Sequence, residues 1–262
     1  MTTKYELTNV WQQIELPDGG LVTVHRVRYL IGDFESGGWI ETEHNLSQSG
    51  SCRVLGEAVV CGHARVSGGA RVHERALIHG WARVRGAAVV SGDVEISGNA
   101  DVYGNAVLWE HASVYGHARV FGRARVGGCA RVLDQAIVRG ATTIGGHATV
   151  RERARAAGVD SWDNVALTVG GNVDVCGCAN LPAYGRFCGD LIIHGQMLPE
   201  GRVLTTIVQR DGVPTGSEQE TDQDVGDDAT YESNAARSGR VSRVPRKVMR
   251  PRGRREIKNV DE

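Results

Sequence analysis

The sequence predicts an all-β protein, a single-stranded parallel β-helix (β-solenoid) with about 18 residues per coil and an N-terminal β-hairpin cap. Three observations support this fold class. An aliphatic residue recurs every six residues, a glycine follows most of these residues two places later, and the 262 residues include 35 Gly but only 3 Phe. Packing separate layers around a core needs large side chains, so this composition argues against a layered fold.

The first 50 residues are expected to form a β cap. Two β-rich runs, residues 5–16 and 21–30, flank the segment Pro-Asp-Gly-Gly at 17–20, which is a strong hairpin signal. Stacked coils leave unpaired backbone groups at both ends, so a solenoid needs a cap there. We expect Trp39, which follows the hairpin, to plug the open end of the prism.

A six-residue unit, Ala-x-Val-x-Gly-x, begins at Val54. The spacing of two places the Ala and the Val on one face of a short strand, and the glycine permits a positive φ at which the chain turns. Three such sides make one coil, and coils stack about 4.8 Å apart. An amphipathic helix is excluded, because a period of six does not match 3.6 and each glycine would cost about 1 kcal/mol. The aliphatic positions are Val54, Val60, Val66, Val72, Ile78, Val84, Val90, Ile96, Val102, Leu108, Val114, Val120, Val126, Val132, Val138, Ile144 and Val150.

The glycine position has four exceptions within this stretch, namely Glu74, Glu110, Asp134 and Glu152. Near residues 158–164 the register slips by one residue, and the aliphatic period then resumes at 169. The β-helix is therefore expected to span residues 51–208, about eight coils and ~38 Å, with a last strand at 203–208.

Residues 209–262 are expected to form a disordered tail, because they are rich in charge, Gly, Ser and Pro and poor in aromatic residues. An acidic block at 218–232 precedes a basic block at 237–258. Cations on such an arm predict salt-dependent binding of nucleic acid or another polyanion, with a solvated tail as the alternative. The basic candidates are Arg243, Arg246, Lys247, Arg250, Arg252, Arg254 and Arg255.

The composition predicts a soluble, cytoplasmic protein. The charges nearly cancel, with 30 Lys plus Arg against 31 Asp plus Glu. No apolar run approaches the ~18 residues of a membrane-spanning helix, and the first residues do not resemble a signal peptide. Six scattered cysteines are expected to be free thiols rather than a disulfide framework.

The repeat resembles the hexapeptide-repeat, left-handed β-helix superfamily, strongly over residues 54–156 and loosely over 163–197. The segment 33–47 followed by Gly-x-Ala-x-Val repeats is similar to bacterial and phage β-helix proteins often labelled as acyltransferases. This resemblance implies a left-handed coil. Enzymes of the superfamily act as trimers, with a catalytic His and an acyl-CoA held between neighbouring prisms. Here the glycine comes one place later than in the superfamily, and no catalytic residue of the superfamily matches by position.

Equivalent residues of successive coils should form columns on the outside of the solenoid. One column contains Asp93, His111, Cys129 and His147, whose side chains are typical zinc ligands. Four ligands in a straight line do not make a tetrahedron, so solvated turn residues are the favoured interpretation and no metal is favoured. The histidines to test first for acyl transfer are His79 and His117.

A second column contains Arg85, Tyr103, Phe121 and Arg139, with Trp109 and Tyr115 at equivalent outward places on neighbouring sides. Stacked aromatic residues indicate a subunit interface first and a ligand platform second. Outward arginines, such as Arg65 and Arg83, are expected to pack the aliphatic part of the side chain on the sheet and to keep the guanidinium group in water. If an anionic polymer binds, this ridge and the basic arm are the expected contacts.

These residues favour a non-catalytic β-solenoid scaffold or binding protein. It is expected to self-associate, with a trimer favoured, and to present a flat surface and a charged tail to a partner. The first alternative is an acyltransferase that acts at a trimer interface with acetyl-CoA or another acyl-CoA; otherwise no cofactor is expected. The second alternative is nucleic-acid binding through the basic tail.

Overall fold

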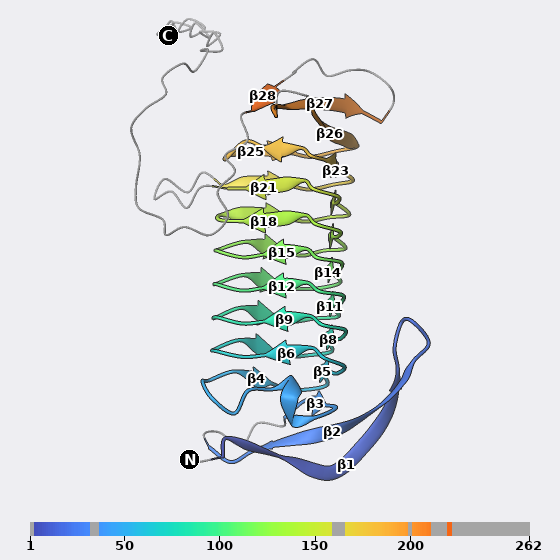
Figure 1. Ribbon diagram of the computed structural model, residues 1–262, viewed down its shortest axis with the longest axis vertical. Helices are drawn as coiled ribbons and strands as arrows, with labels where there is room; N and C mark the ends of the chain where they lie inside the picture. The colour runs from blue at the N-terminus through green and yellow to red at the C-terminus, as the bar shows by residue number, and fades with distance from the viewer. Residues whose placement is uncertain (1–2, 32–36, 159–165, 199–200, 211–218, 222–262) are drawn as a thin grey trace, which may run out of the picture. The chain divides into compact units, whose positions relative to one another are not determined.

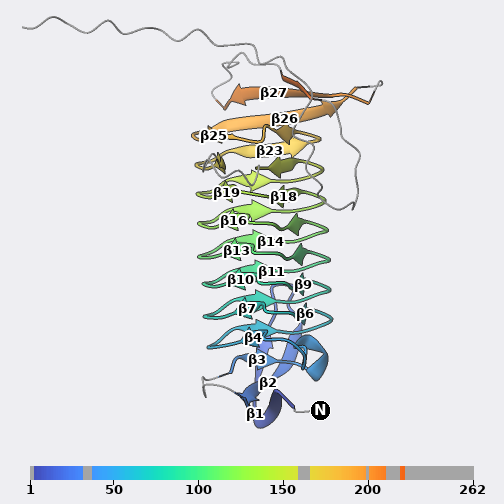
Figure 2. The ribbon, with the colours of Figure 1, turned by 90° about the vertical axis from the view of Figure 1, so that its left-hand side faces the viewer.

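The computed structural model describes residues 3–31, 37–158, 166–198, 201–210 and 219–221. Within these residues the chain forms short strands and one 3-10 helix, η1 (Glu43–Asn45), and no α-helix. The strands stack into a parallel β-solenoid of about eight turns, which confirms the fold class predicted from the sequence (Figures 1 and 2). The left-handed winding stays a prediction.

Three sheets form the three faces of the solenoid. Face 1 stacks β3 (Trp39–Ile40), β5 (Val59–Val60), β8 (Leu77–Ile78), β11 (Glu95–Ile96), β14 (Ser113–Val114), β17 (Arg131–Val132), β20 (Thr149–Val150), β23 (Asp174–Gly177) and β26 (Leu191–Met197). Face 2 stacks β4 (Arg53–Val54), β7 (Arg71–Val72), β10 (Val89–Val90), β13 (Val107–Leu108), β16 (Arg125–Val126), β19 (Thr142–Ile144), β22 (Leu167–Val169) and β25 (Gly185–Phe187). Face 3 stacks β6 (Arg65–Val66), β9 (Arg83–Val84), β12 (Asp101–Val102), β15 (Arg119–Val120), β18 (Ile137–Arg139), β21 (Arg155–Ala157) and β24 (Asn180–Leu181).

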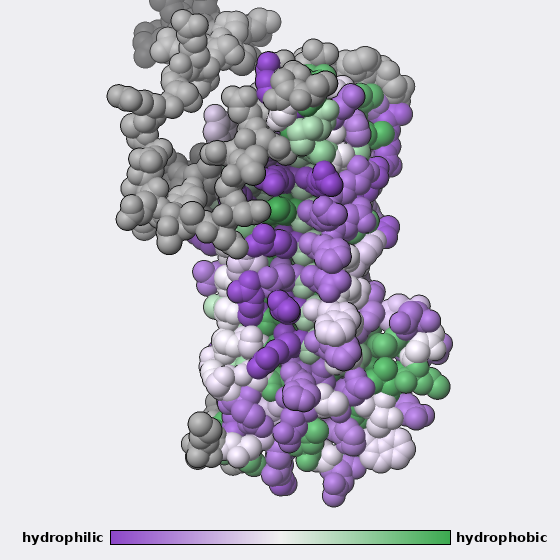
Figure 3. Space-filling view, in the orientation of Figure 1, coloured by the Kyte–Doolittle hydropathy of each residue, from purple (hydrophilic) through white to green (hydrophobic). Residues whose placement is uncertain are grey.

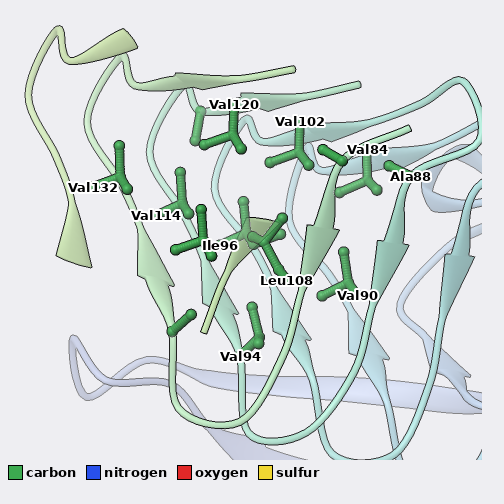
Figure 4. Close-up of a cluster of buried hydrophobic side chains, with 14 of the residues drawn as sticks. Val84, Ala88, Val90, Val94, Ile96, Val102, Leu108, Val114, Val120 and Val132 are labelled. Carbon is green, nitrogen blue, oxygen red and sulfur yellow. The ribbon is translucent and has the colours of Figure 1, made fainter. Parts of the chain in front are cut away.

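The coil length and the core follow the sequence pattern. Val60 pairs with Ile78 and Val84 with Val102, in agreement with the predicted coil length. Every aliphatic position of the repeat from 54 to 150 is fully buried, and the small residues two places earlier line the same interior. Figure 4 shows some of these side chains, among them Val84, Ile96 and Leu108, pointing into the prism. Each buried Val or Ile contributes about 1.5–3 kcal/mol.

The corners explain both the glycines and their exceptions. The glycines that follow the aliphatic residues have φ near +70°, and Glu74, Glu110, Asp134 and Glu152 adopt φ of 60–62° at the same place. This left-handed conformation is strained for residues with a side chain. Two of the acidic exceptions form a compensating hydrogen bond, because Asp134 accepts the Glu152 amide at 3.0 Å and Glu152 accepts the Gly177 amide at 2.8 Å.

The register slip is larger than the sequence suggests. Arg139 pairs with Ala157, one normal coil later, but Ile144 pairs with Val169 instead of with position 162. One coil therefore carries a seven-residue insertion rather than a single extra residue. A six-residue period fixes a coil's length only to within multiples of six, so one extra residue and seven give the same pattern. Most of the insertion, residues 159–165, lies outside the described residues.

The predicted hairpin caps the N-terminal end of face 1. Strand β1 (Tyr5–Glu15) pairs antiparallel with β2 (Leu21–Tyr29), and β2 pairs antiparallel with β3. Tyr5 and Tyr29 are buried in the prism core. The Tyr5 hydroxyl donates to the Leu46 carbonyl at 2.6 Å, and the Tyr29 hydroxyl accepts the Val54 amide at 2.7 Å. Two tyrosines thus close the end of the prism and satisfy the backbone groups exposed there.

Trp39 is not the plug that the sequence suggested. In β3 its neighbour Ile40 points into the core, so Trp39 lies on the outer surface of face 1. There it packs in a separate cluster with Val24, Val59 and Cys61, beneath the hairpin. Its indole Nε1 donates to Glu57 at 2.9 Å. Trp39 therefore attaches the hairpin to the side of the solenoid.

The C-terminal end is closed by antiparallel strands. The expected last strand is present as β27 (Val203–Gln209), which pairs antiparallel with β26 and, on its other edge, with β28 (Gln219–Thr221). The acidic block beyond residue 221 and the whole basic block lie outside the described residues. In the part of the chain that is described, no helix has the length and apolar character required to span a bilayer.

Candidate functional site

Basic side chains gather on face 3. Its outward positions from β6 to β21 include Arg65, Arg83, Arg85, Arg119, Arg139 and Arg155, against the single acidic residue Asp101. On face 1, by contrast, Arg151 binds Asp174 at 3.0 Å, so its charges are paired within the sheet. Face 3 therefore carries an excess of positive charge.

The aromatic column predicted on face 3 is present as a close stack. The ring centroids of Tyr103 and Phe121 lie 4.7 Å apart, and the two ring planes are parallel to within 3°. The Arg85 guanidinium lies 4.2 Å from the Tyr103 ring centroid and binds both carboxylate oxygens of Asp101. Arg119 donates to the Tyr103 hydroxyl at 2.9 Å. Both rings are only half-exposed and have guanidinium groups close against them, so this surface is more cationic than apolar.

The other predicted members of this surface lie apart from the stack. Trp109 is on face 2, where Arg125 lies 5.9 Å from its ring centroid, and Tyr115 is on face 1, 5.6 Å from Arg131. Arg139 is exposed at the end of β18 on face 3. The aromatic residues therefore form three separate arginine-covered sites, one on each face.

The column of zinc-type ligands lies on the corner between faces 2 and 1. Asp93 accepts a hydrogen bond from Arg75 at 2.6 Å and lies 3.5 Å from His111 Nδ1. The Arg75 guanidinium lowers the pKa of Asp93. Cys129 and His147 follow at the same corner and are exposed. Over the residues that the structure places, no three His, Cys, Asp or Glu side chains gather as a metal site.

Candidate acid–base and thiol groups are scattered. His79 Nε2 lies 3.2 Å from Glu95 on face 1, with 13% of its side chain exposed, and His117 is exposed at the corner between faces 1 and 3. Cys176 Sγ lies 3.5 Å from His194 Nδ1, but burial raises the pKa of the Cys176 thiol. Burial likewise raises the pKa of Cys61 to about 12. Neither thiol is therefore activated as a thiolate nucleophile.

A cleft of about 810 Å³ opens at the N-terminal end of face 3. Its floor is the outer surface of β6 and β9, and its wall is the segment 41–49, which contains η1. Two arginines, two histidines, one tryptophan and several hydroxyl groups face it. The lining residues are Glu41, Thr42, His44, Ser47, Ser49, Gly62, His63, Arg65, Ser67, Trp81 and Arg83.

One buried side chain, Asn45, holds the wall of the cleft in place. Its amide nitrogen donates to the carbonyls of Gly62 and Ala64, each at 2.9 Å, and its oxygen accepts the Thr42 amide at 2.8 Å. These bonds join the first coil to the corner of the next one. Leu46, the following residue, then enters the core. The wall is therefore held both by the hydrogen bonds of Asn45 to backbone groups and by the burial of Leu46 in the core.

The cleft floor holds two arginines that have no acidic partner among the described residues. Arg65 and Arg83 are exposed and directly opposite each other in adjacent parallel strands. Within the described residues neither of them forms an ion pair. Glu41 also lines the cleft, but its carboxylate accepts the Gly62 amide at 2.6 Å. Like charges directly opposite each other are unfavourable, so an anion between them would be stabilising.

An aromatic platform stands at the edge of the same cleft. The Trp81 indole stacks on the His63 ring at 3.9 Å and 22°, at the corner between faces 1 and 3. Trp81 is nevertheless 59% exposed. The sequence places His63 above Trp81 in one column and Arg65 beside Arg83 in another. The sequence does not predict the wall of the cleft, because segment 41–49 lies outside the repeat.

The fold and the cleft define a parallel β-solenoid with a cationic face. No protein-family model matches this chain, and no curated protein matches it.

Proposed function

We propose that this protein is a non-catalytic β-solenoid that binds an anionic partner on face 3. The observation that carries the proposal is the excess of arginine on this face, where Arg65 and Arg83 lack carboxylate partners among the described residues. Arginine binds phosphate, sulfate and carboxylate groups in a bidentate manner, and parallel β-strands place the backbones of Arg65 and Arg83 about 4.8 Å apart. Arginines on several strands of one face can bind several anionic groups of the same partner.

The alternative of an acyl-CoA-dependent acyltransferase has less support. His79 pairs with Glu95 on face 1, and His117 is exposed at a corner. An acyl transfer needs a base beside an open cleft that holds the acyl donor. The cleft described above is lined instead by His44 and His63, of which His63 is stacked on Trp81.

The alternative of nucleic-acid binding through the basic tail concerns residues outside the described part.

Heparin, used as a general polyanion probe, tests the proposal on the full chain. We expect the double variant Arg119→Glu/Arg139→Glu, which alters face 3 outside the cleft, to weaken heparin binding about tenfold or more and to reduce the salt dependence. The matched control is Arg71→Glu, because Arg71 is an exposed outward arginine on face 2. Binding that is unchanged in the double variant but abolished by Arg250→Gln/Arg252→Gln/Arg254→Gln would favour the tail instead.

Self-association is the second part of the proposal. The hairpin is a better candidate for this contact than the aromatic column with Tyr103 and Phe121. The aromatic stack of face 3 is half-exposed, whereas Val10, Trp11 and Leu21 on the hairpin are 59%, 60% and 71% exposed. Figure 3 shows hydrophobic residues gathered on the hairpin, beside a mostly hydrophilic solenoid. Within the described residues β1 is also an edge strand. Exposed apolar groups on an edge favour contact with another chain.

Light scattering after size exclusion tests this part. A trimer would have three times the 28.2 kDa mass of the single chain. We expect Val10→Ser/Trp11→Ser/Leu21→Ser to shift the protein to monomer. Tyr184→Ser serves as the control, because Tyr184 is 59% exposed elsewhere on the surface. A wild-type protein that is monomeric at micromolar concentration contradicts the self-association proposal.

A further inference from the structure

We propose that the cleft at the N-terminal end of face 3 binds a nucleotide, with its base on Trp81 and its phosphate between Arg65 and Arg83. This inference rests on the proposed function, since it names the ligand class for one end of the cationic face. The nucleotide is either free or part of a single-stranded nucleic acid, because both present the same base and phosphate. Three features of the cleft support this ligand class.

The first feature is the arginine pair on the floor. Arg65 and Arg83 lie on strands that pair in register, so their side chains leave the sheet one strand spacing apart. Each guanidinium offers a planar fork of N–H donors that fits two phosphate oxygens. Since no carboxylate among the described residues pairs with either side chain, both forks are available to a ligand.

The second feature is the indole of Trp81. Its ring is supported by His63 at 3.9 Å and still keeps 59% of its surface exposed. A flat aromatic surface that is held by a stacked neighbour and open to solvent can stack on a base. Stacking tolerates any base, so this platform selects for a planar ring rather than for a particular sequence.

The third feature is the set of hydroxyl groups that line the cleft together with the two anchors. Ser67 on the floor, and Thr42, Ser47 and Ser49 on the wall, bring hydroxyl groups to the cleft. Hydroxyl groups can donate to phosphate oxygens and exchange hydrogen bonds with a ribose. The volume of about 810 Å³ is within the range of small-molecule sites and can accommodate a nucleoside phosphate.

Calorimetric titration of the full chain with AMP tests the inference, with adenosine and inorganic phosphate as partial ligands. We expect AMP to bind at least tenfold more tightly than either part, because only AMP engages both anchors. UMP should bind within about fivefold of AMP, since stacking is tolerant of the base. A single-stranded RNA hexamer forms the other arm, in which tighter binding than AMP assigns the site to RNA and equal or weaker binding to a free nucleotide.

Matched variants locate the ligand. Arg65→Ala/Arg83→Ala should weaken AMP binding at least tenfold, whereas Arg71→Ala, an outward arginine in the same coil on face 2, should leave it unchanged. Trp81→Ala should weaken AMP binding about tenfold, whereas Tyr184→Ala, at an equally exposed aromatic side chain, should not change it. All of these positions are at the surface, so we expect the variants to fold like the wild type. Circular dichroism verifies this.

Three results would overturn the inference. These are AMP binding no tighter than phosphate, an equal loss of affinity in Arg71→Ala, or no response to Trp81→Ala. Heparin binding separates this failure from that of the proposed function, because the heparin variant changes Arg119 and Arg139, which lie on face 3 outside the cleft. A protein that binds heparin through these arginines but does not bind AMP retains the proposed function and loses only the nucleotide site.

Discussion

Replacing Gly92 with alanine is expected to destabilise the solenoid by about 3 kcal/mol or more. Gly92 turns a corner with φ of +82°, and a Cβ added there would lie 2.6 Å from both the amide nitrogen and the carbonyl oxygen of Glu110 in the next coil. The left-handed conformation alone costs a residue with a side chain about 1–2 kcal/mol. The remaining loss comes from backbone crowding, which no side-chain rotation can relieve.

Gly56→Ala is the matched control for this crowding. Gly56 occupies the same position in an earlier coil with φ of +64°, but an added Cβ would stay 3.4 Å from the nearest atoms of Glu74. We therefore expect Gly56→Ala to cost only the conformational part, about 1–2 kcal/mol. Urea unfolding followed by circular dichroism gives both values. Equal losses in the two variants would show that close approach between successive corners does not limit the stack.

Amide hydrogen exchange can locate the damage within the stack. In a solenoid each coil contacts only its neighbours, so stability is close to a sum of local terms. Faster exchange in Gly92→Ala should therefore be concentrated in the coils that contain β10 and β13. Uniformly faster exchange along the whole stack would indicate a single cooperative unit instead.

Replacing Asn45 with alanine is expected to cost about 3 kcal/mol and to open the cleft wall. Asn45 is fully buried, and its removal leaves the carbonyls of Gly62 and Ala64 and the amide of Thr42 without these partners. A buried polar group left unsatisfied costs about 1–3 kcal/mol. Because the side chain joins segment 41–49 to the next coil, its loss should also raise hydrogen exchange in that segment.

Ser49→Ala is the control for Asn45→Ala. Ser49 lies on the same wall but is exposed, so its loss is expected to change the free energy of unfolding by less than about 0.5 kcal/mol. Urea unfolding again provides the comparison. If the two variants have closely similar free energies of unfolding, the hydrogen bonds of Asn45 do not hold the wall.

The candidate site was only partly predictable from the sequence. The coil period places His63 with Trp81 and Arg65 with Arg83 in adjacent coils, and their register pairs and ring stacking confirm this arrangement. It also places Tyr103 with Phe121. The period carries no information about segment 41–49, which precedes the first full repeat. That segment, in which Leu46 bridges Val66, lines the cleft together with outward residues of β6 and β9.

The sequence by itself determined the repeat, the buried ladder and the hairpin, because each follows from a local spacing of apolar, small and turn residues, and it correctly predicted the 18-residue coil. Tertiary structure decided where Trp39 packs, how many residues the insertion holds and which residues line the cleft. These depend on contacts between segments that no periodic pattern connects. Trp39 could have entered the prism, but the register of β3 turned its side chain outward and brought in Ile40 instead.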